Sequence, residues 1–451
     1  MTLVRDLASG ARDQAREKAS GGEGGKRSSE PGRPLRILMP SYRSDPFTGG
    51  QGVYLRHVTK ALADLGHKVD VISGPPYPQL DQRVGLIKLP SLDLYSKPKN
   101  WLGVPSYPSA EIRDWIDVGE YWSHVFGGFG EPRTFGARLA RWMRLHRADY
   151  DVVHDNQTLA FGLLDIARMG IPVVGTLHHP ITMDRRIAVD HAPSLKLKLL
   201  IMRWYSFLRM QKKVARRLAV ITVASENTKK DAARDFGLDP AAMHVIYLGI
   251  DAERFRPMPG IERSKRRLMA TASADVPLKG LVYLVRAYAL LLKRYPDLEL
   301  TVVGRLREGP TAQLLKELGI IERVRFVSGL TDEDIARLYA EATIAVAPSV
   351  YEGFGFPPGE AMACGVPVVS TTGGSLPEIV GDAGLTVPPK DSEALAAAIA
   401  RLLDDEALRT EMGERGRRRI HEKFLWSRTA QELTALYRNV IANADARSQR
   451  A

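Results

Sequence analysis

Seven residues separate two glutamates, Glu352 and Glu360, in the stretch SVYEGFGFPPGEAMACGVPVV at residues 349–369. Three of the seven are glycines, so the backbone there can approach a ligand closely. Two such carboxylates suit three tasks: general acid and base in cleaving a sugar bond, binding of a ligand rich in hydroxyl groups, or service as one loop residue and one helix cap. The elements that carry the glutamates decide among these tasks.

The two glutamates are expected on different elements. The apolar run TIAVAPS predicts a buried strand, and VYEGFG predicts a loop after it. Pro357 and Pro358 cannot continue a strand but suit the first positions of a helix, so we expect a helix over residues 358–364. Glu352 then lies on a loop beyond a strand end. Glu360 lies in a first helical turn, where the dipole is expected to lower its pKa, which argues against hydrolysis.

A second glycine-rich segment, TGGQG at residues 48–52, follows the first predicted strand, LRILMPS at residues 35–41. A helix is expected after it, over residues 53–65. Gly50 and Gly52 would let the backbone approach a ligand while the helix N–H groups face an anion. The spacing is not the G-x-G-x-x-G of nicotinamide dinucleotide sites, and no acidic residue stands where such a site needs one. The segment is either a phosphate-binding loop or a tight turn.

Histidines and aspartates offer further candidates. His178 follows the strand-like run PVVGTL, and ligands of open parallel sheets bind beyond strand ends, so His178 is a cleft candidate. The acidic triplets at residues 149–151 and 332–334 resemble the paired aspartates of metal-dependent sugar transferases. The first leads into a strand, and the second follows Thr331 at a helix start, where capping accounts for it. No metal site is expected.

Strand-like and helix-like segments alternate in two successive sets, which predicts an α/β fold with two doubly wound, Rossmann-like parallel-sheet domains facing a central cleft. The 451 residues are also too many for one ordinary core. The remaining strands are expected at KVDVIS, DVVH, PVVGTLHH and LAVITVAS, and then at RRLMATAS, LELTVVG, VRFVSG and VPVVST. The predicted parts are a disordered tail over 1–34, domains over 35–255 and 262–425 with a hinge near 250–262, and a helix over 426–451 that can return to the first domain.

Two segments depart from this alternation. Residues 92–146 contain Trp101, Trp115, Trp122 and Trp142, and we expect a local aromatic core over the first sheet; a lid over a substrate is the alternative. Residues 195–218 contain eight basic residues and no acidic one, between leucines and aromatic residues. Three interpretations stay open: a solvated basic face, a core helix with snorkelling basic side chains, and a helix that lies on anionic lipid.

Composition narrows the class of protein. The single cysteine, Cys364, excludes a disulfide framework. No apolar run approaches the ~18 residues of a membrane span, and the N-terminus lacks an apolar signal core, so a cytosolic protein is expected. The net charge of +12 suits nucleic acid, an anionic membrane surface or phosphorylated substrates and does not choose among them.

The complete motif EGFGFPPGEAMACGVPVV resembles the E-x7-E motif of the family-4 retaining glycosyltransferases, which have the GT-B fold. Segments GGQG, TLHH, TVASENTKKD, LGIDAERFRP and PLKGLVYLVRAYA extend the resemblance over nearly the whole chain after residue 34. It implies an acceptor-side N-terminal domain, a nucleotide-sugar-binding C-terminal domain, a nucleoside diphosphate sugar as donor, and no cofactor or metal ion.

The resemblance also implies residue roles. Glu352 and the N–H groups of the residues after it would bind the donor sugar, Glu360 the ribose hydroxyls, and Lys279 of PLKG the donor diphosphate. His178 matches the histidine near the donor sugar. The implied catalytic residues are Glu352, His178 and Lys279. The implied donor-binding residues are Gly50, Gly52, Lys279, Arg305, Glu352, Gly353, Phe354, Gly355 and Glu360.

The chain departs from the family pattern at several positions. The arginine usual five or six residues before the lysine is absent, and Ser273 and Ala274 occupy that region. Arg305 of VVGRLREG is the expected replacement for this charge. Leu248 replaces an asparagine, and His179 replaces an aspartate. These changes suggest an unusual subgroup and leave the acceptor open.

The predicted function is retaining transfer of a hexosyl group to an acceptor, by the front-face route attributed to the family, in which a donor phosphate oxygen takes the acceptor proton. A membrane lipid or envelope glycan intermediate is the leading acceptor, with residues 195–218 touching an anionic membrane at its inner face. The alternatives are a GT-B phosphorylase or disaccharide synthase, and a non-enzymatic nucleotide- or nucleic-acid-binding protein. Nucleic acid is not expected, because the sequence has no RNA-stacking module.

Overall fold

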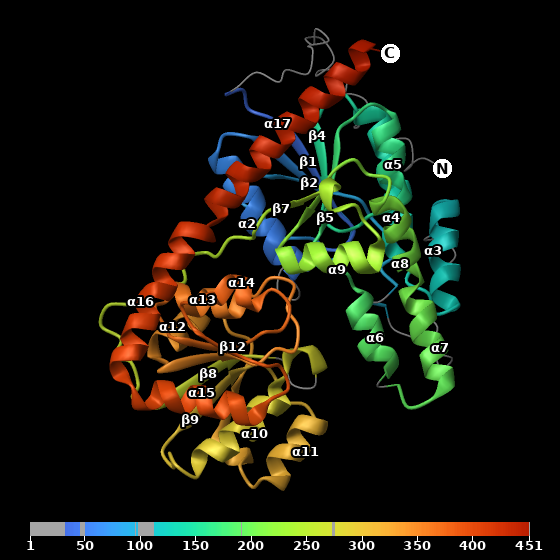
Figure 1. Ribbon diagram of the computed structural model, residues 1–451. Helices are drawn as coiled ribbons and strands as arrows, with labels where there is room; N and C mark the ends of the chain where they lie inside the picture. The colour runs from blue at the N-terminus through green and yellow to red at the C-terminus, as the bar shows by residue number, and fades with distance from the viewer. Residues whose placement is uncertain are drawn as a thin grey trace.

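The computed structural model describes residues 32–45, 50–94, 96–97, 112–190, 192–272 and 276–450, with side chains to residue 447. Two parallel sheets form its frame, one in each half of the chain (Figure 1). The tail predicted over 1–34 lies outside the described residues apart from 32–34, as do Trp101, Ser273 and Ala274.

The first sheet has seven parallel strands in the order β3-β2-β1-β4-β5-β6-β7. Its strands are β1 Arg36–Ser41, β2 Lys68–Ser73, β3 Gly85–Lys88, β4 Val152–Asp155, β5 Val173–Leu177, β6 Ile221–Val223 and β7 Met243–Val245. Central strands carry continuous apolar runs because helices cover both faces, and Leu38 of β1 pairs with Val153 of β4. The strand order reverses between β1 and β4, where such sheets bind ligands beyond their carboxyl ends.

The second sheet has six parallel strands in the order β10-β9-β8-β11-β12-β13. Its strands are β8 Arg267–Thr271, β9 Glu299–Val303, β10 Val324–Val327, β11 Ile344–Ala347, β12 Val368–Thr371 and β13 Leu385–Val387. The order reverses between β8 and β11. The loops that follow these two neighbouring strands therefore start side by side.

Helices flank both sheets (Figure 1). The first half contains α2 Gly50–Asp64, α3 Trp115–Val125, α4 Glu131–His146, α5 Phe161–Arg168, α6 Thr182–Asp190, α7 Leu195–Trp204, α8 Leu208–Ala215 and α9 Glu226–Phe236. The second contains α10 Leu281–Leu292, α11 Pro310–Glu317, α12 Asp332–Glu341, α13 Phe356–Ala363, α14 Leu376–Val380, α15 Ser392–Asp404, α16 Glu406–Lys423 and α17 Trp426–Arg450. Short 3₁₀ helices cover Tyr205–Phe207, Pro240–Ala242, Pro277–Lys279 and Ile321–Arg323.

The chain crosses between the halves twice, after β7 and between α16 and α17. The crossings touch, since the N–H of Ile250 donates to the carbonyl oxygen of Phe424 over 2.7 Å. Helix α17 then runs back along α2 of the first half (Figure 1). Its Tyr437 hydroxyl lies 2.5 Å from Nδ1 of His154 on β4. The end of the chain thus packs against the sheet with which the described chain begins.

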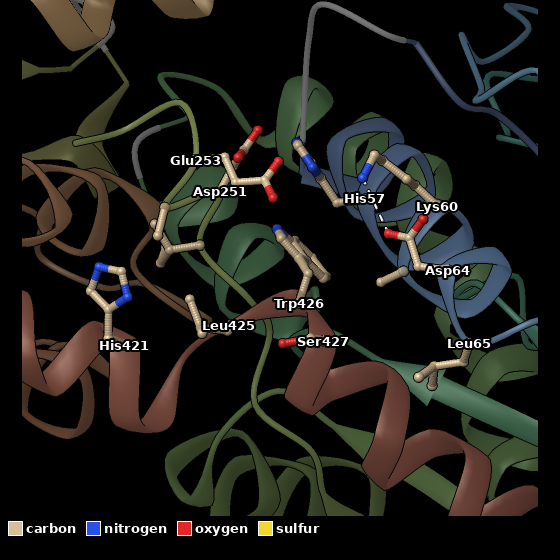
Figure 2. A pocket seen from close by; sticks show the side chains of 13 residues that line it. His57, Lys60, Asp64, Leu65, Asp251, Glu253, His421, Leu425, Trp426 and Ser427 are labelled. Carbon is tan, nitrogen blue, oxygen red and sulfur yellow. Dashed lines mark hydrogen bonds and ion pairs between the residues drawn. The ribbon is translucent and has the colours of Figure 1, made fainter.

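A cavity of about 370 Å³ opens beside these crossings, between α2, the linker after β7, and the start of α17 (Figure 2). The His57 ring stacks on Trp426, with ring centroids 5.3 Å apart and planes 9° from parallel. Trp426 also lies near Phe356, the first residue of α13, at 6.4 Å between centroids. One indole therefore contacts both halves of the molecule.

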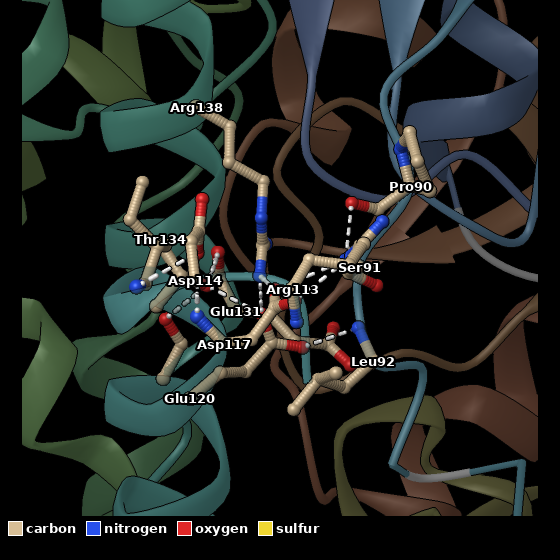
Figure 3. A network of polar contacts seen from close by, with 12 residues as sticks. Pro90, Ser91, Leu92, Arg113, Asp114, Asp117, Glu120, Glu131, Thr134 and Arg138 are labelled. Atoms are coloured by element: carbon tan, nitrogen blue, oxygen red, sulfur yellow. Dashed lines mark hydrogen bonds and ion pairs between the residues drawn. The ribbon is translucent and has the colours of Figure 1, made fainter. Parts of the chain in front are cut away.

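The aromatic core predicted over residues 92–146 is wrong for two of its tryptophans. Trp115 is 87% exposed and Trp122 is 52% exposed. The buried contact between α3 and α4 is ionic instead: Arg138 donates to Asp117 and Glu120, each over 2.6 Å (Figure 3). Because these charges satisfy one another inside, α3 turns its large apolar side chains outward.

The basic stretch at residues 195–218 is not one helix. The 3₁₀ turn at Tyr205–Phe207 separates α7 from α8. Helix α8 buries Leu208, Met210 and Val214 in the core, whereas α7 has no buried residue and leaves Leu195 73% and Leu199 58% exposed. None of the helices formed by the described residues has both the length and the apolarity to span a membrane. Helix α8 is therefore the anchor, and α7 presents apolar and basic side chains to solvent.

Candidate active site

Lys279 and Glu352 meet at the switch point of the second sheet. Lys279 ends the 3₁₀ helix after β8, and Glu352 lies on the loop after β11. The Lys279 ammonium donates to Oε1 of Glu352 over 2.8 Å, and the Ser349 hydroxyl donates to the same oxygen over 2.7 Å. Gly280, at φ +65°, permits this approach, because a Cβ there would lie 2.0 Å from the carbonyl oxygen of Pro348.

The side chain of Phe354, in the loop after Glu352, is buried. The Phe354 ring is 5% exposed and packs between Phe356 and Phe424. Gly355, at φ +115°, precedes α13 in a backbone conformation that favours glycine. Phe354 therefore anchors the loop through its ring, and only its backbone remains for a ligand.

Glu360 has a different charge state from the predicted one. Helix α13 begins at Phe356, so Glu360 is its fifth residue and lies past the first turn. Burial, and to a smaller extent the nearby carboxylates of Asp332 and Asp251, raise its pKa to about 8 against the opposing charge of Lys279. The predicted lowering is wrong because loss of hydration outweighs the helix dipole. A protonated carboxyl can donate as well as accept a hydrogen bond, which suits a hydroxyl partner.

His178 follows β5 at the carboxyl edge of the first sheet. The ring Nε2 of His178 lies 2.7 Å from Oδ1 of Asn156. The backbone N–H of His178 donates to Oε1 of Gln157 over 2.7 Å. Since Oδ1 can only accept, Nε2 carries the proton, which leaves Nδ1 as the acceptor. Burial lowers the pKa of His178 to about 3, so the imidazole is neutral near pH 7.

The loop of residues 352–355 lies next to His178 where the two halves meet. The carbonyl oxygen of Gly353 accepts from the hydroxyls of Ser225 and Thr228, over 3.1 and 3.2 Å. A Cβ on Gly353 would lie 3.0 Å from the carbonyl oxygen of His178. The Thr228 hydroxyl also donates to that His178 oxygen over 3.3 Å. The structure thus brings the loop that carries Glu352, which is bonded to Lys279, next to His178.

Three further predicted site residues lie on other elements: Gly50 and Gly52 on α2, and Arg305 after β9. Both glycines belong to the first turn of α2, which begins three residues earlier than predicted. A Cβ on Gly52 would lie 2.0 Å from the carbonyl oxygen of Asp45, whereas Gly50 has open space. Arg305 is exposed two residues after β9. Within the described chain, no hydrogen bond or ion pair joins Arg305 to the Lys279–Glu352 pair.

The acidic triplets have structural partners. Asp151 pairs with Arg36 at 2.8 Å, and Asp332 pairs with Arg56 at 2.7 Å. Thr331 and Asp334 form a capping box, which confirms that prediction. The described residues contain no group of three or more His, Cys, Asp or Glu side chains arranged to hold a metal ion.

Sequence reasoning missed two contacts between the halves. Arg56 of α2 reaches Asp332 of α12, and Glu378 of α14 reaches the start of α9. Glu378 stands in GGSLPEIV, just past the recognised motif, but no local pattern reports a partner 151 residues away. Both contacts depend on how the halves pack.

Two doubly wound parallel sheets, one in each half of the chain, are the architecture of the GT-B fold. Two solved structures share the fold. Sucrose-phosphate synthase from Thermosynechococcus elongatus has a TM-score of 0.66 at 23% identity, over 91% of this chain and 100% of that one. Anabaena HepE in complex with UDP and glucose has a TM-score of 0.64 at 19% identity, over 89% and 99%.

Sequence comparison identifies the family. Residues 48–254 match the model described as Glycosyltransferase Family 4, and residues 256–419 match Glycosyl transferases group 1. The MMP alpha-(1->4)-mannosyltransferase of Mycolicibacterium hassiacum is 46% identical over 91% of this chain and 100% of that protein. The D-inositol 3-phosphate glycosyltransferase of Salinispora tropica is 28% identical over 91% and 86%. The chain belongs to the family-4 glycosyltransferases, and it is an enzyme that transfers sugar.

Proposed function

We propose that this enzyme transfers a mannosyl group, with retention and without a metal ion, from a nucleoside diphosphate sugar to a glycan acceptor. The observation that carries the proposal is the Lys279–Glu352 pair, held over 2.8 Å at the switch point beside a loop that faces His178. The choice of mannose is supported by the name of the 46% identical relative. In this proposal residues 262–425 bind the donor and residues 35–255 bind the acceptor.

Each side chain has one task in the proposed reaction. Lys279 neutralises the departing diphosphate, with Arg305 and the start of α2 at Gly50 and Gly52 as further contacts. Glu352 and the backbone of Gly353, Phe354 and Gly355 bind the donor sugar. Nδ1 of His178 accepts from a sugar hydroxyl.

Proton transfer follows the front-face route. The acceptor oxygen bonds to the anomeric carbon, the bond from that carbon to the diphosphate breaks, and a phosphate oxygen takes the acceptor proton. Glu360, whose pKa is raised to about 8, is largely protonated near pH 7 and binds ribose hydroxyls rather than serving as base. The charge of Lys279 does the work that a metal ion does in other transferases.

The surface of α7 favours an acceptor carried on a membrane. Helix α7 exposes Leu195 and Leu199 beside Lys196 and Lys198, a combination that suits an anionic bilayer. Co-sedimentation with vesicles that contain or lack anionic phospholipid tests this part, with L195E/L199E as the matched variant. Absence of sedimentation at low salt would leave a freely dissolved glycan as the acceptor.

The transfer reaction is tested with purified protein, GDP-, UDP- and ADP-linked hexoses, and mannoside acceptors. The proposal predicts an elongated product from one donor, with the anomeric configuration retained, in the presence of a chelator. Inactivity of the wild type toward all donors, or product formed only when divalent ions are added, contradicts it. Release of a sugar phosphate from the glycoside, only when inorganic phosphate is added, would indicate the phosphorylase alternative.

A further inference from the structure

The carboxylate of Glu378, on α14, reaches the first turn of α9 in the opposite half of the molecule. Its Oε2 accepts the N–H of Glu226 over 2.8 Å, and its Oε1 accepts the N–H of Asn227 over 2.7 Å. The hydroxyl of Tyr247 donates to Oε2 over 2.9 Å. Two of these donors are backbone groups that have no partner inside their own helix. Both carboxylate oxygens of Glu378 therefore accept hydrogen bonds from groups in the other half.

The N-terminal cap of α9 satisfies neither of the two backbone N–H groups that donate to Glu378. Ser225 caps the helix, and its hydroxyl oxygen accepts the N–H of Thr228 over 3.0 Å. The N–H groups of Glu226 and Asn227, the first two helical residues, need an acceptor from elsewhere, and the helix dipole favours an anion there. The start of α9 thus offers two neighbouring donors that match one carboxylate.

The residue before helix α14 also holds the loop of residues 352–355, which carries Glu352. Ser375 precedes α14, and its hydroxyl donates to the carbonyl oxygens of Glu352 and Phe354, over 3.0 and 2.5 Å. Its N–H donates to the Glu352 carbonyl oxygen over 3.0 Å. A Cβ on Gly374, at φ +66°, would lie 2.2 Å from that same oxygen. The loop and α14 therefore form one packed unit, and the position of Glu378 sets the position of the loop.

The turn of α9 that binds Glu378 also binds the loop. The hydroxyls of Ser225 and Thr228 donate to the carbonyl oxygen of Gly353. Nearby, the hydroxyl of Tyr351 donates to Oδ2 of Asp231 on α9 over 2.8 Å. Since Thr228 also donates to the carbonyl oxygen of His178, one helical turn connects the catalytic residues of both halves.

We propose that Glu378 is a positioning residue for sugar transfer. By binding the start of α9, it fixes the loop of Glu352 at the correct distance from His178 when the two halves close on the substrates. This inference rests on the proposed function. Glu378 acts only through Ser375 and the loop. A carboxylate is needed because both oxygens must accept, whereas an amide offers only one acceptor.

Steady-state kinetics test the role with E378A, E378Q and Y247F. The matched control is E414Q, which changes an exposed glutamate on α16. We expect kcat to fall about 10- to 100-fold in E378A and by a smaller factor in E378Q, because hydrogen bonds to charged groups are the strong ones. The dissociation constants for GDP and UDP should change less than about 2-fold, since the contacts of Glu378 are to the other half. An unchanged kcat in folded E378A overturns the inference.

Amide hydrogen exchange tests the contact without a need for activity. In E378A the protection of the Glu226 and Asn227 amides against exchange should fall about 10-fold or more. The Thr228 amide, which donates to the Ser225 hydroxyl, should keep its protection. Equal exchange at Glu226 and Asn227 in wild type and E378A overturns the inference. If the wild type transfers no sugar while these two amides respond, then the proposed function fails and the docking of Glu378 stands.

Discussion

The ammonium of Lys279 lies 2.8 Å from Oε1 of Glu352, although the two are 73 positions apart in the chain. Lys279 follows β8 and Glu352 follows β11, and the strand order of the second sheet reverses between these two neighbouring strands. The two side chains therefore come together. The lysine therefore does two things: it supplies positive charge beside the proposed donor site, and it fixes the orientation of the carboxylate. Loss of either side chain should consequently affect the other.

Replacing either member of this pair should reduce transfer strongly. We expect K279A and E352Q each to lower kcat by about 100-fold or more, the usual effect of removing one preorganised electrostatic contact. The double variant K279A/E352Q should lose less than the product of the single losses, because the two act as a unit. Initial rates with the active donor measure this, and circular dichroism checks the fold. Near-wild-type rates in E352Q would refute the assignment of the donor site.

The stability of the protein should depend on the protonation of Glu360. Its pKa in the folded protein, about 8, lies above the ordinary value of 4.5, so the protonated form is favoured by folding. The stabilisation is complete below the unfolded pKa and is lost as the pH rises through about 8. We expect E360Q to reduce the fall in unfolding free energy between pH 5 and pH 9. Urea titrations at several pH values measure this, and parallel curves for both proteins would contradict it.

Asp332 should couple the halves of the molecule to the charge state of Glu360. Arg56 and Arg254 both donate to Oδ2 of Asp332, over 2.7 and 2.6 Å. D332N removes that charge, so the pKa of Glu360 should fall toward its ordinary value. Carboxyl titration by NMR measures the shift. A pKa of Glu360 that is unchanged in D332N would contradict a contribution from the charge of Asp332.

A double-mutant cycle over Arg56 and Asp332 should give a coupling of about 0.5–1 kcal/mol. The pair is partly exposed, which keeps the value near that of surface ion pairs. The coupling should decrease as salt is added. A coupling of zero in low salt would show that the contact between α2 and α12 is incidental.

His178 should not titrate in the range where enzymes usually use histidine. With a pKa near 3 it stays neutral from pH 5 to pH 8, and Asn156 holds the proton on Nε2. Nitrogen NMR of the imidazole should therefore show one tautomer across this range. We expect N156A to lower kcat by about 10-fold, because the ring loses the partner that orients it. A histidine titration near pH 6.5 assigned to His178 would contradict this account.

Much of the fold follows from the sequence, but three of the four edge strands do not. Ten strands have apolar runs that predict them, whereas β3, β7 and β13 do not, and all three lie at sheet edges. An edge strand has one neighbour and is partly exposed, so no continuous apolar run is needed. Gly85–Lys88 alternates between half-buried and exposed residues, and β7 and β13 have three residues each.

The candidate site divides in the same way. Lys279, Glu352 and His178 each follow a strand, so local pattern and resemblance locate them. The raised pKa of Glu360 depends on burial and on Asp332 and Asp251, which lie outside its own element. The partners of Glu378 belong to the other half. Properties that depend on packing between distant segments leave no local signal.

The return of α17 to the first half has a consequence for protein engineering. Residues 426–450 follow the second domain in the chain, yet Tyr437 lies against His154 of β4. A chimera that takes the second half from a relative should therefore exchange only the segment between the two crossings. Everything from Trp426 onward should stay with the recipient, because Trp426 already stacks on His57 of α2. The segment to exchange thus lies inside the chain, between β7 and α17, and does not extend to the last described residue.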